Sequence, residues 1–505
     1  MLALHRRVLC LALVSASTLI AGCGTQVVNP VTGQTERSVM DERSEIAEGR
    51  KAHEQVLKEY GRYDNAAVQA YVNDIGQKLA ARSHRAHLSW TFTVLDSPEI
   101  NAFALPGGYV YVTRGIMAYM DSEAELAGVI GHEIGHVTAR HGAQRATRQQ
   151  NAGLGVLAAT VLGAVLEGQG VRGATDLASQ VSQTAAAGFI ASYSRDQELQ
   201  ADQLGAEYLA RNQYDPGNMV DVIALLKSQE RFAADAARAQ GRSAPSGNNW
   251  LASHPSNDAR LAHIEDVARQ YKGQAAGQYS DDGRTRYLKA IDGMRFGDSP
   301  EHGLTRGANF LHPSLNVAMT APNGWRILNE SESVTLLNAT ADAGLVMQLA
   351  PANASKDREA LLRQLIQPVS GEVDAREFNG LQATHFNGVV RNSKGQQAAM
   401  RLTVVSGPGG RSYLLRYVAK DAAALKRALP QIEQAERSFR AMNKADQQAA
   451  RPWAVRTVPY PKGGFAELAR QSPLETQAQE HLRLLNSVYG SNREPAVGTS
   501  VKTVR

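Results

Sequence analysis

The segment "GHEIGH" places His132 and His136 four residues apart, with Glu133 between them. In an α-helix, positions i and i+4 lie on one face, so both imidazoles can reach a single ion while Glu133 lies beside it. Neutral imidazole suits Zn²⁺, and zinc acidifies a bound water whose proton a neighbouring carboxylate can take. The pattern therefore predicts zinc-assisted peptide hydrolysis, with one zinc per chain. H-E-x-x-H also arises by chance, so the surrounding sequence has to support the interpretation.

A third ligand is needed, because a catalytic zinc site has three protein ligands and a water. The pattern H-E-x-x-H-x-x-G-x-x-H of one zinc peptidase class is absent, since Ala139 and Gly142 occupy its last two defined positions. His141 is nine residues beyond His132, on the opposite side of a continued helix, and is expected at the surface.

Downstream, "SYSRDQELQADQLGAEYL" offers a carboxylate ligand on a predicted helix. Glu198 is the candidate, and Asp202 follows one turn later on the same face. A carboxylate there can accept the second N–H of a ligand histidine and fix its orientation. The alternative is a solvated acidic helix face, which is the commoner role of such residues.

Four ordered motifs, "NAFALPGGYVYVTRG", "HEIGH", "SRDQELQAD" and "HPSNDAR", resemble the zinc metallopeptidase family of the CAAX prenyl proteases, HtpX and BepA. The resemblance covers residues from about 40 to 270. It implies zinc ligation by His132, His136 and Glu198, with Glu133 as general base and Asp202 as supporting acid. The sequence shows no 34-residue helical repeat, so client recognition by such repeats is not implied.

The last motif contains His254 and Arg260. Either side chain could donate a hydrogen bond to the oxyanion that develops on the attacked carbonyl. A neutral His254 could instead occupy the open position of zinc and restrain the protease. The other interpretation is a loop histidine and a surface ion pair. We favour a switch in which His254 binds zinc at rest.

The segment before the helix reads as two short strands around a Pro-Gly-Gly turn. An extended substrate could add to its edge, which would present a scissile carbonyl with little demand on sequence. The alternative is a packed sheet edge without such a role. The predicted substrate-binding residues are Ala104, Leu105, Pro106, Gly107, Gly108 and Tyr109.

The N-terminus resembles a bacterial lipoprotein signal, with Arg6 and Arg7, an apolar run, and Ile20-Ala21-Gly22-Cys23. Cleavage before Cys23 would leave a fatty-acylated cysteine, and Gly24 favours the periplasmic face of the outer membrane of a Gram-negative bacterium. The alternatives are an ordinary secretory signal or a membrane anchor. The other cysteine, Cys10, lies inside the signal, so disulfide scaffolds and cysteine nucleophiles are excluded.

Length and pattern predict several domains in an α+β chain. A mainly helical zincin (gluzincin) protease domain with a small sheet is expected first, then a separate α+β domain and a short C-terminal module. The uncharged stretch 152–166 is expected to be a buried helix pair or a contact with a membrane or client. The expected divisions are a signal (1–22), a tether (23–40), the peptidase (41–275), a linker (276–308), an α+β domain (309–442) and a tail (443–505), in which two helical pieces faintly resemble a LysM-type module.

The 54 Lys and Arg residues nearly balance the 49 Asp and Glu residues, and no basic run interleaved with aromatics predicts nucleic-acid binding. The sequence thus predicts a lipid-anchored zinc endopeptidase that cleaves misfolded or unassembled envelope proteins. Outer-membrane assembly machinery or peptidoglycan are candidate partners. The rival is a nonenzymatic, chaperone-like assembly factor that keeps the zinc fold. An intact Glu133 favours catalysis, because a structural zinc site needs no base.

Overall fold

The computed structural model describes residues 25–145, 147, 193–239, 254, 258–274, 279–330, 333–351, 355, 357–366, 368–391, 397–475 and 477–505. The predicted signal, Cys23 and the uncharged stretch 152–166 lie outside these residues.

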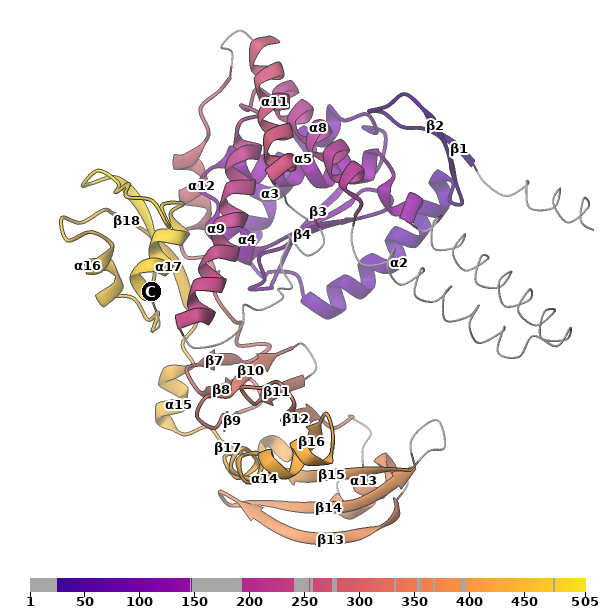
Figure 1. Cartoon of the computed structure of the whole chain (residues 1–505), viewed down its shortest axis with the longest axis vertical. Helices are drawn as coiled ribbons and strands as arrows, with labels where there is room; N and C mark the ends of the chain where they lie inside the picture. The colour runs from indigo at the N-terminus through magenta and orange to yellow at the C-terminus, as the bar shows by residue number, and fades with distance from the viewer. Residues whose placement is uncertain are drawn as a thin grey trace, which may run out of the picture.

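A mainly helical unit with a three-stranded sheet forms the first half of the chain (Figure 1). The strand order is β3-β5-β4, with β3 parallel and β4 antiparallel to β5, so β4 is an edge strand. The elements are α2 (Glu42–Tyr60), α3 (Ala66–Ala81), β3 (Thr91–Leu95), β4 (Ala102–Leu105), β5 (Tyr109–Thr113), α4 (Arg114–Tyr119), α5 (Glu123–Thr138), α8 (Arg195–Arg211), α9 (Asn218–Ala239), α11 (Asp258–Gln274), α12 (Arg284–Ile291) and the two-residue strand β6 (Arg295–Phe296).

Helix α5 begins after Ser122, because the Ser122 hydroxyl accepts a hydrogen bond from the Glu125 backbone N–H at 3.1 Å. All sixteen of its residues are buried. It crosses α8 closely at glycines: a Cβ on Gly135 would lie 2.9 Å from the Ala201 carbonyl oxygen, and one on Gly205 would lie 3.1 Å from the His132 nitrogen. This approach brings α8 against the H-E-x-x-H turn.

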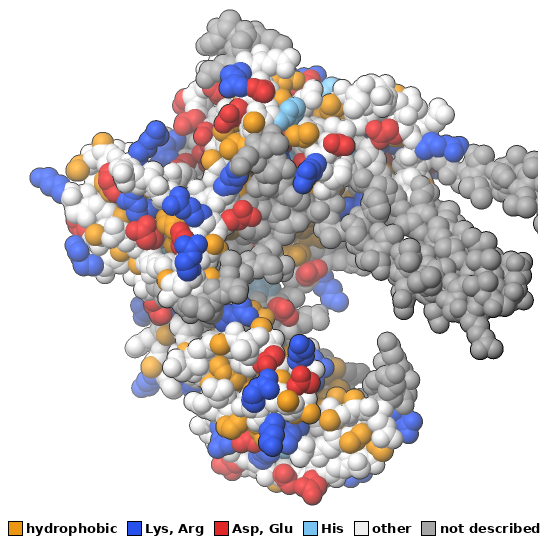
Figure 2. Space-filling view, viewed as in Figure 1, with side chains coloured by type: hydrophobic (Ala, Val, Ile, Leu, Met, Phe, Trp, Pro, Cys, Tyr) orange, Lys and Arg blue, Asp and Glu red, His pale blue; other side chains and the backbone are white. Residues whose placement is uncertain are grey.

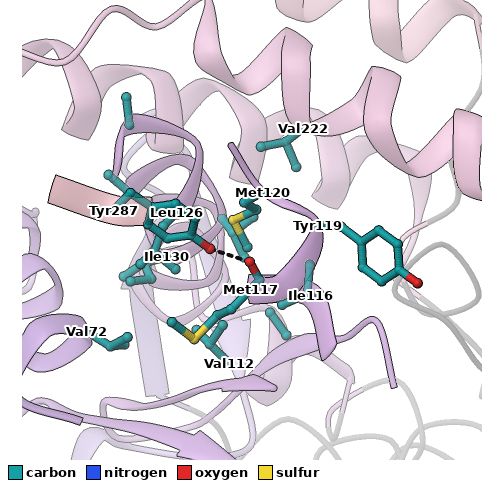
Figure 3. Packing of buried hydrophobic residues seen from close by; sticks show 14 of the residues in the cluster. Val72, Val112, Ile116, Met117, Tyr119, Met120, Leu126, Ile130, Val222 and Tyr287 are labelled. Carbon is teal, nitrogen blue, oxygen red and sulfur yellow. Dashed lines mark hydrogen bonds between the residues drawn. The ribbon is translucent and has the colours of Figure 1, made fainter. Parts of the chain in front are cut away.

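The core of this unit collects apolar side chains from α3, β5, α5, α9 and α12 (Figure 3). Tyr287 of α12 is fully buried, and its hydroxyl donates to the Met117 carbonyl. The core thereby packs α5 against these surrounding elements. Its members include Val72, Val112, Ile130 and Val222.

The later region is rich in strands, which confirms the mixed α+β class. Its seven-stranded antiparallel sheet has the order β10-β11-β12-β16-β15-β14-β13, with α14 on one face and α13 on the other. The four-stranded sheet β17-β9-β8-β7 adjoins it. The elements are β7 (Leu304–Arg306), β8 (Asn309–His312), β9 (Val317–Thr320), β10 (Arg326–Asn329), β11 (Ser333–Leu337), β12 (Ala343–Leu349), α13 (Arg358–Leu365), β13 (Pro368–Phe378), β14 (Leu381–Arg391), β15 (Gln397–Ser406), the 3₁₀ turn η1 (Pro408–Gly410), β16 (Ser412–Ala419), α14 (Ala422–Arg437), β17 (Arg440–Ala441) and α15 (Lys444–Ala449).

The C-terminal segment returns to the peptidase unit, where it was expected as an appended tail. It comprises β18 (Trp453–Pro459), α16 (Gly464–Arg470), α17 (Ala478–Leu485) and β19 (Ser500–Val504). Strand β18 pairs with both β6 and β19, and its apolar residues share one core with α5. The strand-rich region is therefore inserted between β6 and β18, and the expected linker carries α12, β6 and β7.

A buried lysine ties the last strand to the start of the H-E-x-x-H helix. Lys502 is 0% exposed, and its Nζ lies 3.0 Å from both the Tyr119 carbonyl oxygen and Asp121 Oδ1. The Glu125 carboxyl lies in the same cluster and accepts from the Asp121 backbone N–H at 2.7 Å.

Residues expected to form part of a tether instead form a hairpin, β1 (Thr25–Val28) and β2 (Thr35–Ser38). Asn29 at its turn is 3% exposed and donates to Gln200 of α8. A flexible polar segment would have no such buried contact.

The described helices include none that is both long enough and apolar enough to span a bilayer. On the described part of the face in Figure 2, side chains of both charge signs are interspersed rather than gathered into one basic surface.

Substitution Glu125→Gln should stabilise the protein increasingly as the pH rises from 5 to 8. Burial, with the nearby Asp121 carboxylate, raises the pKa of Glu125 to about 8, whereas a glutamate in an unfolded chain titrates near pH ~4.3. Between these values the folded state holds a proton that the unfolded state releases, so stability falls with rising pH by at most about 1.4 kcal/mol per unit.

Urea unfolding at both pH values measures the effect. Glu123→Gln is the matched control, because the Arg286, Tyr71 and Tyr214 hydrogen bonds lower the pKa of Glu123 against the opposing effect of burial. That variant should lose stability at pH 8. An equal gain for Glu125→Gln at both pH values would contradict the raised pKa.

Candidate metal centre

Helix α5 turns both motif histidines toward α8. His132 and His136 are 0% and 2% exposed, and their Nε2 atoms lie 3.0 Å apart. Glu133 is fully buried beside them. The i and i+4 spacing therefore produces the shared face that the sequence predicts.

Helix α8 supplies the carboxylate from the other side. Glu198 is 1% exposed, and its oxygens lie 3.6 Å from His132 Nε2 and 3.5 Å from His136 Nε2. Burial raises the pKa of Glu198 to about 7, although His132 and Arg260 oppose that rise. The solvated acidic face considered from the sequence is thus not what α8 presents here.

His254 completes the cluster from a segment far along the chain. It is 0% exposed, and its Nδ1 lies 3.0 Å from Glu198 Oε1 and 3.2 Å from His132 Nε2. Its Nε2 lies 3.7 Å from Glu133 Oε1. Burial lowers the pKa of His254 to about 3, so the imidazole is neutral.

These donors fit a zinc ion. His132, His136, Glu198 and His254 each offer one ligand atom, and the four atoms lie within 4.8 Å of one another. Ligands about 2.0–2.2 Å from a tetrahedral zinc lie roughly 3.3–3.6 Å apart, and the measured separations are close to that range. Burial holds the pKa of His136 well below its usual value, which leaves a lone pair for a cation. The cluster is consistent with one zinc.

A charged layer lies behind His132. Its Nδ1 lies 2.9 Å from Asp202 Oδ1, and Arg260 binds Asp202 through two nitrogens at 2.6 and 2.7 Å. A third contact joins Arg260 Nη1 to Glu198 Oε2 at 2.7 Å. Burial favours a higher pKa for Asp202, but Arg260 and His132 outweigh it and lower that pKa. Arg260 is 3% exposed, so it does not form a surface ion pair.

The expectation that His141 lies at the surface is wrong. It is 0% exposed, and its Nδ1 lies 2.8 Å from His136 Nδ1. Helix α5 ends at Thr138, and Arg140 adopts a positive φ of 57°. The chain therefore leaves the helical path, and the turn returns His141 beneath His136.

Tyr193 is a site residue that the sequence did not indicate. Its ring stacks on His136 with centroids 3.9 Å apart and planes 22° apart. Arg145 lies over the Tyr193 ring at 4.2 Å. In the sequence, Tyr193 is marked only by its position five residues before Glu198. Other aromatic residues also flank helices, so this position does not identify Tyr193 as a site residue.

The predicted substrate segment lies at the β4–β5 turn. Ala104 and Leu105 belong to the edge strand β4, and with Pro106 they line a cleft of about 20 Å³ that reaches His136 and Tyr193. Gly107 has φ 84°, and a Cβ there would lie 2.7 Å from the Ile46 Cα, so α2 packs directly on this turn. Gly108 also has a positive φ, and Tyr109 stacks on His53 of α2.

Fold and site together define a zinc metallopeptidase domain built on an H-E-x-x-H helix. Residues 66–268 match the family described as Peptidase family M48, and the match includes all four residues of the candidate zinc site.

Several known proteins are similar in sequence to part of this chain. The chain is 30% identical over 214 residues to the beta-barrel assembly-enhancing protease of Yersinia pestis, covering 42% of this chain and 40% of that one. It is 29% identical over 206 residues to the protein of that name from Escherichia coli strain K12, covering 40% and 39%. The mitochondrial metalloendopeptidase OMA1 of Arabidopsis thaliana is 36% identical over 137 residues, covering 27% and 26%. The matches thus span about two fifths or less of these relatives.

Removing metal-site residues on α8 should lower zinc content in a graded way. Glu198→Ala should lose the ion, whereas Asp202→Ala should weaken zinc affinity by about 10 to 100-fold, because it removes only the partner of His132 Nδ1. Competition with a chelator measures both. Asp196→Ala, at an exposed position of the same helix, is the control. Full zinc content in Glu198→Ala would contradict the assignment.

Proposed function

We propose that the protein is a zinc-dependent endopeptidase. The observation that carries the proposal is the buried convergence of His132, His136 and Glu198 with Glu133 alongside. A site that only stabilised the fold needs no carboxylate beside its ligands, whereas a hydrolytic site needs a base at that place.

The residues divide the chemistry among them. Zinc, when bound to such a set, polarises the scissile carbonyl and acidifies a water. Glu133 takes the proton of the attacking water and passes it to the leaving amine. Asp202 holds His132 in one tautomer, and Arg260 compensates the charges of Asp202 and Glu198. We assign Arg260 this positioning role rather than a contact with the oxyanion.

The peptide substrate would bind along β4 as an added strand. Residues 104–109 would then hold its backbone beside the metal centre, which favours unfolded or extended segments over compact ones. The cleft lined by Ala104, Leu105 and Pro106 also reaches His136, which supports this placement.

Glu133→Gln should bind zinc normally but lose cleavage of an unfolded protein such as casein by at least about 100-fold, the usual contribution of a general base. Metal analysis and a peptide-release assay measure the two properties. Unchanged cleavage in the variant would point to a contaminating protease and contradict the role. Wild-type protein that binds zinc but cleaves nothing, even with His254 removed, would favour the rival assembly factor.

The position of His254 favours a resting state in which this histidine blocks the metal site. A catalytic zinc site keeps one position open for water or substrate, and His254 lies where it would occupy that position. We propose that it binds zinc at rest and moves aside when substrate arrives.

His254→Ala should therefore raise cleavage of a flexible substrate several-fold while zinc content stays at one per chain. His263→Ala, on the neighbouring helix α11 and outside the cluster, is the control. A large fall in activity would instead assign His254 to stabilising the transition state, and unchanged activity would make it a bystander.

The cellular setting is also a proposal. Two relatives are named for enhancing β-barrel assembly, and the "IAGC" segment ending at Cys23 resembles a lipobox. We propose a lipid-anchored protease on the periplasmic face of the outer membrane, acting on misfolded or unassembled envelope proteins. Outer-membrane assembly machinery, or peptidoglycan bound through the C-terminal segment, are its proposed partners.

A further inference from the structure

His136 Nδ1 begins a chain of hydrogen-bonding contacts that ends in the N-terminal hairpin. His136 Nδ1 lies 2.8 Å from His141 Nδ1, and His141 Nε2 lies 3.1 Å from Gln200 Oε1. Asn29 Nδ2 lies 2.9 Å from the same Gln200 oxygen. Asn29 and His141 are 3% and 0% exposed, so water does not compete freely for these contacts.

The turn of the hairpin determines which groups in this chain donate. Asn29 Oδ1 accepts from the backbone N–H groups of Val31 and Thr32 at 2.9 and 3.2 Å. Its Nδ2 must therefore point toward Gln200, whose carbonyl oxygen can only accept. A second donor to that oxygen has to be His141 Nε2–H.

The position of the hydrogen on His136 can be assigned next. Metal binding by His136 through Nε2 places its hydrogen on Nδ1. His136 Nδ1 therefore donates across the 2.8 Å contact, and His141 Nδ1 accepts. His136 Nε2, which faces Glu198 and His132, is left with its lone pair for an ion.

We propose that the N-terminal hairpin is a positioning element of the metal centre. Through Gln200 and His141, Asn29 holds His136 in the tautomer and orientation that bind metal. The proposal rests on the proposed function only in taking His136 as a metal ligand. Asp202 contacts His132 directly, whereas the hairpin reaches His136 through Gln200 and His141, so metal retention on that side depends on the docked hairpin.

The test measures zinc release to a chromophoric chelator from the full chain carrying Glu133→Gln, without any peptidase assay. His141→Ala should speed release by about 10 to 100-fold, the usual cost of losing the partner of a ligand histidine. His141→Gln should restore part of the loss, because its amide oxygen can accept from His136 Nδ1–H.

Two further variants break the chain at a distance from the ligands. Asn29→Asp keeps the acceptor for Val31 and Thr32 but removes the donor to Gln200 and to Glu36, whose Oε1 lies 3.0 Å from Asn29 Nδ2. Gln200→Leu removes the shared acceptor, whereas Gln200→Glu keeps it. Asn29→Asp and Gln200→Leu should each speed zinc release at least about threefold, whereas Gln200→Glu should not. In Co²⁺-substituted protein, the visible absorption bands should change in Asn29→Asp and Gln200→Leu and stay unchanged in Gln200→Glu.

The control is Gln26→Ala, at an exposed position of β1 in the same hairpin. Wild-type release rates in Asn29→Asp and Gln200→Leu would overturn the proposal. Faster zinc release in Gln26→Ala would also overturn it. The same holds if the zinc release rates of all the variants simply follow their melting temperatures. His136→Ala that retains zinc would show instead that the ligand assignment itself fails.

Discussion

The close contact of α5 and α8 is the constraint on which the metal centre depends. Neither helix holds a complete site, because His132 and His136 are on one and Glu198 and Asp202 on the other. Their backbones approach so closely that a Cβ at Gly135 would lie 2.9 Å from a carbonyl of α8. A side chain at that position would push α8 away and separate the carboxylates from the imidazoles.

Once the helices are this close, electrostatics determines the rest of the arrangement. Three carboxylates and a guanidinium are buried together with four imidazoles, and an unpaired charge there would be costly. Arg260 offsets part of the cost of burying these charges, because it contacts both Asp202 and Glu198. Burial holds the pKa of His136 and of His254 below the usual range, so these two imidazoles add no positive charge, and the remaining negative charge faces the place where a cation fits. Charge and geometry thus favour the same occupant.

Support for the centre also comes from both ends of the described chain. The N-terminal hairpin contacts α8, while Lys502 in the last strand binds the segment that leads into α5. The strand-rich region lies between β6 and β18, which are paired neighbours in the peptidase unit. The peptidase fold is therefore complete only after the chain has passed through the inserted region, so truncation after α12 would remove part of its core.

Local sequence was enough to predict the ligand-bearing helix, the carboxylate on a second helix and the strand at the sheet edge. These predictions follow from residue types and spacings within a few residues of one another. The positions of His141 and Tyr193, the docking of residues 25–38 and the return of the C-terminal segment could not be predicted in the same way. Helical extrapolation placed His141 at the surface, but one residue with positive φ after the helix turned it inward. Sequence by itself determined which side chains can do chemistry, because residue type and spacing carry that information. Tertiary structure decided which of them meet, because burial and close backbone contact depend on segments that are far apart along the chain.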